Sequence, residues 1–218
     1  LDKSSAETTA LAFDSTGGQL ATGSKNGTVR FWNTSDGRLL GEWQATQNEV
    51  NRIIFHPDGE RVFVADGESC QVRERNSGAT VLQVGDDSGV AGLALNADGS
   101  LLMVTGDTLP QIWNLKAQRR VETLEGHSDG VASGAFSRDG RWILTGSGYM
   151  RGTSVAPPDD ASSVFVWDAK TRRQLLSYRS AASEVEIVHF VKDGSRIFAG
   201  ERDGKVRRYE CAACVPLP

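Results

Sequence analysis

The sequence predicts an all-β protein assembled from about five copies of one supersecondary unit. The first observation is a period, because an apolar residue near the end of a predicted strand recurs at intervals of 42, 40, 41 and 54 residues. These residues are Phe13, Phe55, Leu95, Phe136 and Phe190. The second observation is a glycine four residues after each of them, at Gly17, Gly59, Gly99, Gly140 and Gly194. Self-similarity at a fixed period is the signature of a repeat fold.

Each repeat contains a pattern of short strands, which is most complete in repeat four. Asp139-Gly140 is the residue pair favoured in tight turns between antiparallel strands. Strands rich in β-branched and aromatic residues are then predicted at residues 141–146, 164–167 and 174–178. Four strands in about 41 residues match one blade of a β-propeller. We therefore expect blades at residues 7–44, 49–85, 89–125, 130–179 and 184–210, followed by a C-terminal tail at 211–218.

The repeats resemble those of the WD-repeat family. Repeat four carries most of the family pattern, as Gly126-His127, Thr145-Gly146-Ser147 and Trp167-Asp168. Other repeats carry parts of it, namely Trp32-Asn33, Trp113-Asn114, Tyr209 and, at the place of the aromatic in repeat two, Glu74-Arg75. The resemblance implies that His127, Ser147 and Trp167 form a buried hydrogen-bonded network within one blade. Because buried polar groups need partners, we interpret His127 as a structural residue rather than a catalytic base.

Repeat four also contains an insertion between its second and third predicted strands. The segment is 12 residues longer than in repeat one, and its Gly, Pro and Ser content over residues 148–163 predicts a loop. In the WD-repeat family this turn opens on a face that commonly binds partners. The resemblance therefore makes Tyr149, Met150 and Arg151 candidate contact residues. An insertion that is tolerated without a function is the alternative.

The two ends of the sequence depart from a closed ring. Repeat five supplies only three strands, and residues 1–6 contain no convincing strand that could complete it. We therefore expect one or two further N-terminal blades in a longer protein, most simply in a seven-bladed ring. A small five-bladed ring is the alternative.

The tail contains Cys211 and Cys214 in a Cys-x-x-Cys spacing. A zinc site would need further ligands, and a redox pair would be expected beside a thioredoxin-like helix. The sequence offers neither the further ligands nor such a helix. The tail instead resembles the last blade of WD-repeat regions in bacterial multidomain regulatory proteins. The total of three cysteines is odd and predicts free thiols in a reducing compartment, hence a cytoplasmic location.

Composition and motifs argue against nucleic-acid binding, a membrane-spanning segment and several classes of enzyme. A net charge of -4 argues against a nucleic-acid partner, and no apolar run approaches the roughly 18 to 20 residues that span a bilayer. The sequence lacks a Gly-x-Ser-x-Gly elbow, a phosphate-binding loop and a His-Glu-x-x-His pair. The acidic residues that recur by position fall in predicted turns, at Asp58, Asp98, Asp139, Asp193 and Asp203.

We therefore expect a non-catalytic scaffold or sensor domain that binds a protein partner, or an effector domain of the same chain, without a cofactor or metal. A propeller offers a rigid disc on which loops can vary without disturbing the core. Two alternatives stay open. One is a hydrolase-type propeller enzyme with a central metal site, and the other is a purely structural subunit of a larger assembly.

Overall fold

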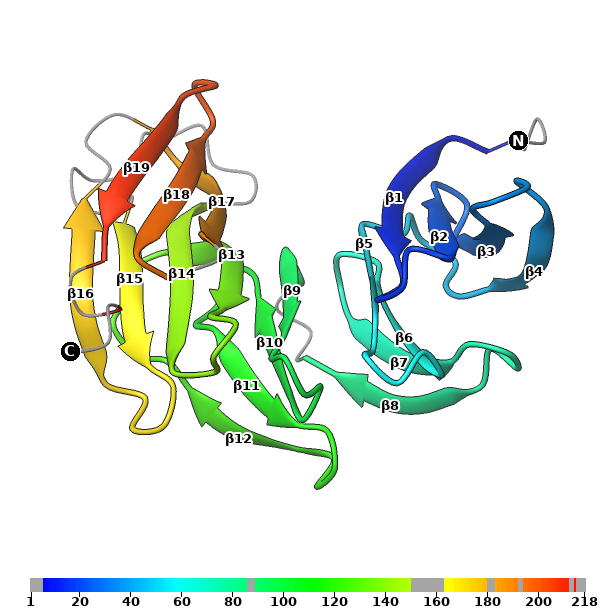
Figure 1. The fold of residues 1–218 in the computed structure, drawn as a ribbon, viewed down its shortest axis with the longest axis horizontal. Coiled ribbons are helices and arrows are strands. Elements are labelled where there is room, and N and C mark those ends of the chain that lie inside the picture. Colours follow the sequence, from blue (N-terminus) through cyan, green and yellow to red (C-terminus); the bar gives the residue numbers. More distant parts are fainter. Residues whose placement is uncertain are drawn as a thin grey trace. The chain divides into compact units, whose positions relative to one another are not determined.

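All regular secondary structure in the described part of the chain is β-strand. The structure is a computed structural model that describes residues 6–85, 89–149, 163–179, 183–191, 194–211 and 214. These residues form strands β1 to β19 in five antiparallel sheets (Figure 1). None of them lies in a helix long and apolar enough to cross a membrane. The all-β fold predicted from the sequence is confirmed.

The first compact unit, Leu1–Val90, contains two four-stranded sheets, here called blades 1 and 2. Blade 1 consists of β1 (Thr8–Phe13), β2 (Gln19–Ser24), β3 (Thr28–Asn33) and β4 (Leu39–Gln44). Blade 2 consists of β5 (Arg52–Phe55), β6 (Arg61–Ala65), β7 (Cys70–Glu74) and β8 (Thr80–Val84). In both sheets the strands follow one another in sequence order, which makes each blade a simple meander.

The second compact unit, Ala91–Pro218, contains blades 3 to 5. Blade 3 consists of β9 (Gly92–Leu95), β10 (Leu101–Thr105), β11 (Gln111–Asn114) and β12 (Arg119–Thr123). Blade 4 consists of β13 (Gly130–Phe136), β14 (Trp142–Tyr149), β15 (Ser163–Asp168) and β16 (Gln174–Arg179). Blade 5 has three strands among the described residues, β17 (Val185–Phe190), β18 (Arg196–Glu201) and β19 (Val206–Glu210).

The repeated glycines lie in the turn between the first two strands of every blade. Their φ angles are 72°, 72°, 74°, 71° and 74°, in the left-handed region where a glycine avoids the steric penalty of a Cβ atom. Each glycine N–H donates to the carbonyl three residues earlier, as Gly17 does to Asp14 at 3.1 Å. A Cβ at Gly17 or Gly140 would meet nothing within 4 Å, so the backbone conformation, not lack of space, requires glycine there. The repeat period therefore has a local physical origin.

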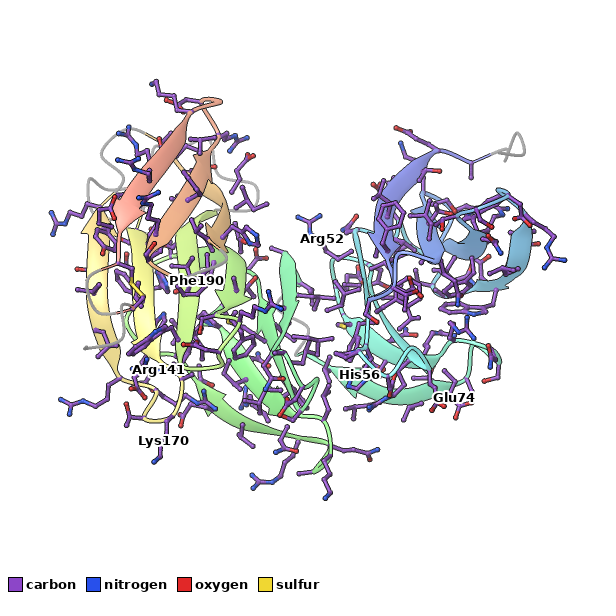
Figure 2. The ribbon with its side chains drawn as sticks, in the orientation of Figure 1. Arg52, His56, Glu74, Arg141, Lys170 and Phe190 are labelled. Carbon is purple, nitrogen blue, oxygen red and sulfur yellow. A yellow bond between two sulfur atoms is a disulfide. The ribbon has the colours of Figure 1, made fainter. Side chains whose placement is uncertain are left out.

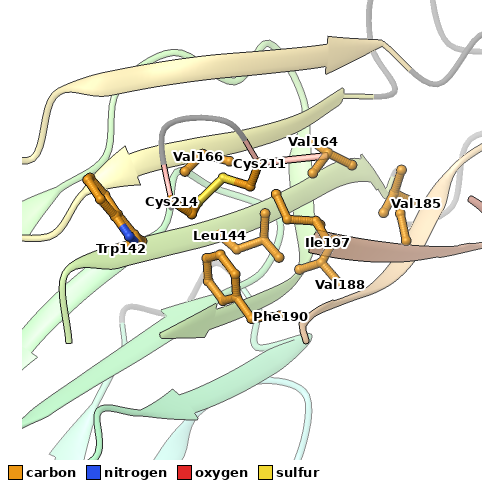
Figure 3. Packing of buried hydrophobic residues seen from close by; sticks show 11 residues of the cluster. Trp142, Leu144, Val164, Val166, Val185, Val188, Phe190, Ile197, Cys211 and Cys214 are labelled. Carbon is orange, nitrogen blue, oxygen red and sulfur yellow. A yellow bond between two sulfur atoms is a disulfide. The ribbon is translucent and has the colours of Figure 1, made fainter. Parts of the chain in front are cut away.

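A second set of glycines lets neighbouring blades of one unit approach closely. In the first unit, a side chain on Gly23 of β2 would overlap Val50 and Ile53 from blade 2. In the second unit, a Cβ on Gly146 of β14 would come within 2.6 Å of Val185 and Val188 from blade 5. Buried apolar clusters lie at these two blade interfaces, as Figure 3 shows for blades 4 and 5, and another lies between blades 3 and 4.

Two local assignments made from sequence spacing are wrong. The spacing puts Glu74-Arg75 at the aromatic place of repeat two, but the strand register puts Arg73 there, because Arg73 pairs with Val62 as Trp32 pairs with Leu20. The spacing also assigns residues 148–163 to a loop. Strand β14 continues through Tyr149, which pairs with Gly130, and β15 begins at Ser163. Counting residues along the chain does not reveal which residues pair across a sheet, and this explains both errors.

Candidate functional site

A buried hydrogen-bond network in blade 4 connects His127, which precedes β13, with Thr145 of β14 and Trp167 of β15. The Nε2 atom of His127 lies 2.6 Å from Oγ1 of Thr145, and the indole N–H of Trp167 donates to the same oxygen over 2.8 Å. All three side chains are buried. A threonine hydroxyl can accept from the indole and donate to an unprotonated imidazole nitrogen, so it can serve both neighbours at once. Thr145 is therefore the centre of the network.

The environment of His127 favours a structural role. Its ring stacks on Phe165 with centroids 4.2 Å apart and an interplanar angle of 14°. Burial lowers the pKa of His127 to about 4, because the charged imidazolium loses its hydration there. The residue is thus neutral near pH 7, and its pKa lies well below the value that suits a general base at that pH. Thr145 is also 0% exposed, so its hydroxyl is not accessible to solvent.

Ser147 lies in the same strand, two residues beyond the centre of the network. Its hydroxyl donates to the carbonyl of Ser163 at 3.2 Å and accepts from the N–H of Ser163 at 3.1 Å. Both residues are buried, so this pair fastens β14 to β15 where the insertion begins and ends. Thr145 is not among the network residues predicted from the sequence. The signal that could have found it is the Thr-Gly-Ser triplet that repeats one and four share, at residues 22–24 and 145–147.

The other blades hold the residue at the tryptophan place in different ways. In blade 1 the indole N–H of Trp32 donates to Oγ1 of Thr22 at 2.9 Å, as in blade 4. In blade 3 a valine replaces the threonine, and Trp113 donates to the side-chain oxygen of Gln111 at 3.1 Å. In blade 2 Arg73 donates to the carbonyls of Ala45 and Gly78 and to the Gln71 side chain. The donor at this place therefore has hydrogen-bond acceptors in blades 1 to 4, whereas in blade 5 the buried hydroxyl of Tyr209 has no hydrogen-bond partner among the described residues.

The predicted contact residues lie at the base of the insertion and within it. Tyr149 is the last residue of β14 and its backbone pairs with Gly130, while its side chain lies outside the described residues. Met150 and Arg151 also lie outside the described residues. Their role in partner binding stays a prediction. The described part of the chain shows only that the insertion leaves and re-enters the blade at the buried Ser147–Ser163 pair.

The hairpin carboxylates serve the turns in which they lie. One oxygen of each accepts a backbone N–H two residues later at 2.9 to 3.1 Å, in Asp58, Asp98, Asp139 and Asp203. Asp193, the remaining member of the set, lies outside the described residues. Figure 2 shows the turns of His56 and Arg141, which belong to blades 2 and 4. Among the described residues, no three or more His, Cys, Asp or Glu side chains gather as metal ligands.

Cys211 and Cys214 form a disulfide (Figure 3). The N–H of Cys214 donates to the carbonyl of Cys211 at 2.9 Å, and this turn brings the two side chains together. Both cysteines are buried in the apolar cluster between blades 4 and 5. The expectation of free thiols is therefore wrong for this pair, whereas Cys70 is free and buried. The odd count of cysteines gave the wrong answer because it does not show which sulfur atoms the fold brings together.

These sheets, turns and tryptophan networks define the class of the protein, which is a repeat protein built from β-propeller blades. The family described as "WD domain, G-beta repeat" matches residues 3–33 and 118–168. These two segments therefore match WD repeats, and proteins with such repeats typically act as protein-interaction scaffolds.

Curated relatives support the same family. The chain is 28% identical over 211 residues to Pre-mRNA-processing factor 19 homolog 2 of Arabidopsis thaliana, and the match covers 93% of this chain and 37% of the relative. It is 27% identical over 156 residues to an uncharacterized WD repeat-containing protein of Synechocystis, which covers 71% of this chain and 42% of the relative. The chain therefore spans less than half the length of these two relatives.

Solved structures agree on the fold. A chain in "Crystal Structure of Mitotic Checkpoint Complex" matches with a TM-score of 0.83 at 19% identity, covering 98% of this chain and 63% of that one. A chain in "Structure of U3-55K" matches with a TM-score of 0.78 at 20% identity, covering 96% of this chain and 63% of that one. At this level of identity the likeness shows the fold alone.

Proposed function

We propose that this chain is a non-catalytic protein-binding scaffold or sensor domain that works within a longer protein. The observation that carries the proposal is a blade whose core is locked by Thr145 and the Ser147–Ser163 pair and which holds a long insertion between β14 and β15. A rigid base with a variable loop suits recognition, because little ordering of the base is needed on binding. The WD-repeat match supports the same class.

The open faces of two blades support a longer protein. In blade 1, Leu11 is 64% exposed, whereas Ile53 at the same place in blade 2 is 4% exposed against blade 1. In blade 5, Val206 is 69% exposed, whereas Val164 at the same place in blade 4 is fully buried against blade 5. Exposed apolar faces of this kind mark interaction surfaces. We propose that further blades of the longer protein, or subunits of a larger assembly, cover them.

The setting that we propose is a longer bacterial protein. The chain spans 42% of the WD repeat-containing relative in Synechocystis, which supports a longer bacterial protein. In such a protein we propose that the propeller restrains an effector domain of the same chain. The cytoplasmic location rested on free thiols, so the Cys211–Cys214 disulfide weakens that argument. Alkylating thiols in intact cells before lysis would test the cytoplasmic location, because Cys211 and Cys214 would both react if the compartment kept them reduced.

The scaffold proposal is tested by binding without turnover. Proteins captured by the full-length parent protein are identified, purified and titrated against wild type and a variant whose residues 150–162 are replaced by a short Gly-Ser turn. We expect the replacement to weaken binding at least about tenfold, or about 1.4 kcal/mol. Lys25→Ala, in the corresponding turn of blade 1, is the control and should bind normally.

Two results would overturn the proposal. One is a purified parent protein that binds no partner in such titrations. The other is turnover in a broad hydrolase screen with stoichiometric bound metal, which would favour the hydrolase-type alternative with a central metal site.

A further inference from the structure

One position on the outer strands distinguishes blade 1 from blades 2 and 4. Gly41 of β4 pairs with Phe31, whereas the same place holds Leu82 in β8, paired with Val72, and Leu176 in β16, paired with Val166. A Cβ on Gly41 would meet nothing within 4 Å. The missing side chain leaves a recess of about 130 Å³ that is lined by Phe31, Leu40, Gly41, Glu42, Trp43, Arg75 and Asn76.

The apolar walls of this recess, here called the rim recess, are held in place before any ligand arrives. Phe31 is buried, and its ring centroid lies 5.6 Å from that of Trp43. The indole N–H of Trp43 donates to the carbonyl of Arg75 at 3.1 Å, and the guanidinium of Arg73 lies 5.4 Å from the indole centroid. Gly78 packs directly against the indole, since a Cβ there would come within 2.8 Å of it. A preformed apolar recess of this kind binds a side chain at low entropic cost.

The charge beside the rim recess is positive and unpaired. Arg75 donates to the side-chain amide oxygen of Gln19, and its Nε atom is buried without a hydrogen-bond partner. Among the described residues no carboxylate lies within ion-pair distance of Arg75. Glu42, the acidic residue of the lining, is already paired with Arg30 at 2.8 Å. Arg75 as a whole is only half-buried, so a carboxylate of a ligand could approach the exposed side of its guanidinium and make a charge-assisted hydrogen bond.

The strand that borders the rim recess has a free edge. Strand β4 has a single neighbour, β3, in its sheet. An extended peptide can add to such an edge through main-chain hydrogen bonds, with its alternate side chains entering pockets. The occupant that fits is therefore an extended segment of a protein, not a small polar metabolite.

We propose that the rim recess binds an extended peptide segment that places a leucine-sized aliphatic side chain on Gly41 and an adjacent carboxylate beside Arg75. The leucine supplies what Leu82 and Leu176 supply within their own blades, and the carboxylate supplies the missing counter-charge. This site deepens the scaffold function proposed above and rests on it, but it is built from residues of blades 1 and 2, whereas the insertion belongs to blade 4.

The test uses the whole chain and four fluorescein-labelled nine-residue peptides on a Gly-Ser host. One carries Asp-Leu at its centre, one Lys-Leu, one Asp-Ser and one Ser-Ser. Fluorescence anisotropy should show the tightest binding for the Asp-Leu peptide. Gly41→Leu fills the recess and should weaken that binding at least about tenfold. Arg75→Gln should remove the preference for Asp-Leu over Lys-Leu, which amounts to about fivefold for a partly exposed charge.

Folding and specificity are controlled in the same experiment. Because the Cβ position of Gly41 is open, Gly41→Leu should unfold within a few degrees of wild type. Leu175→Ser is the control for specificity and should bind the peptide like wild type. Leu175 lies in the outer strand of blade 4 and is 41% exposed, close to the 42% of Leu40, which lines the rim recess.

Equal binding of the Asp-Leu peptide to wild type and a folded Gly41→Leu variant overturns the rim-recess proposal, as does failure of all four peptides to bind wild type. The scaffold function is judged separately, by titration of the purified partner. A partner that binds Gly41→Leu normally but loses affinity for the variant without the insertion leaves the scaffold standing and removes the rim recess. A parent protein that binds no partner removes both.

Discussion

Replacing Thr145 by valine isolates the energetic value of the blade 4 network. Valine has nearly the same shape as threonine, and Val64 and Val104 occupy the same place in blades 2 and 3, so the strand accepts it. The change removes the one oxygen that serves both His127 and Trp167. Leaving a buried donor or acceptor unsatisfied costs about 1 to 3 kcal/mol, so two such groups should cost about 2 to 6 kcal/mol of unfolding free energy.

Thr22→Val in blade 1 is the matched variant, because Thr22 serves one indole, that of Trp32. It should cost about 1 to 2 kcal/mol. Thr145→Ser, which keeps the hydroxyl, should cost less than Thr145→Val. The assay is urea unfolding followed by circular dichroism at pH 7.5, with midpoints compared at a constant slope. Equal losses for Thr145→Val and Thr22→Val, or no loss for Thr145→Val, would refute the assignment of Thr145 as a shared centre.

Three further predictions follow from the same structure. Unfolding free energy should fall by up to about 3 kcal/mol as the pH is lowered from 6.5 to 4, because His127 has a pKa of about 4 when folded and 6.5 when unfolded, so the unfolded chain gains the proton first. His127→Gln should flatten this dependence, and an unchanged slope would contradict it. Cys211→Ala should lower the unfolding free energy by about 2 kcal/mol in the absence of reductant. Wild type that is denatured without reduction should show one free thiol, and three free thiols would show that the Cys211–Cys214 disulfide does not form. Gly146→Ala should cost about 1 to 3 kcal/mol in thermal or urea unfolding because its methyl group meets the next blade, and a neutral result would mean that the blades separate there easily.

The positions of the strands could be predicted because they depend on local chemistry. In every blade a glycine with positive φ lies in the turn between the first two strands. In most blades an aspartate precedes this glycine, so the same short sequence signal recurs in each repeat. The tryptophan places of blades 1, 3 and 4 could be found in the same way. The second repeat was misread because Arg73 carries no aromatic signal, and only its pairing with Val62 identifies its place.

The candidate sites depend on contacts between residues far apart in the chain. Thr145 meets residues 18 and 22 positions away, and the rim recess needs Arg75, whose carbonyl holds an indole 32 residues earlier. The five repeats, their strands and the likeness to WD repeats could be predicted from the sequence, because turn conformation and strand alternation are local properties of the backbone. The role of Thr145 as the shared acceptor, the disulfide between Cys211 and Cys214 and the space at Gly41 could not, because pairing register and packing between blades determine which side chains meet.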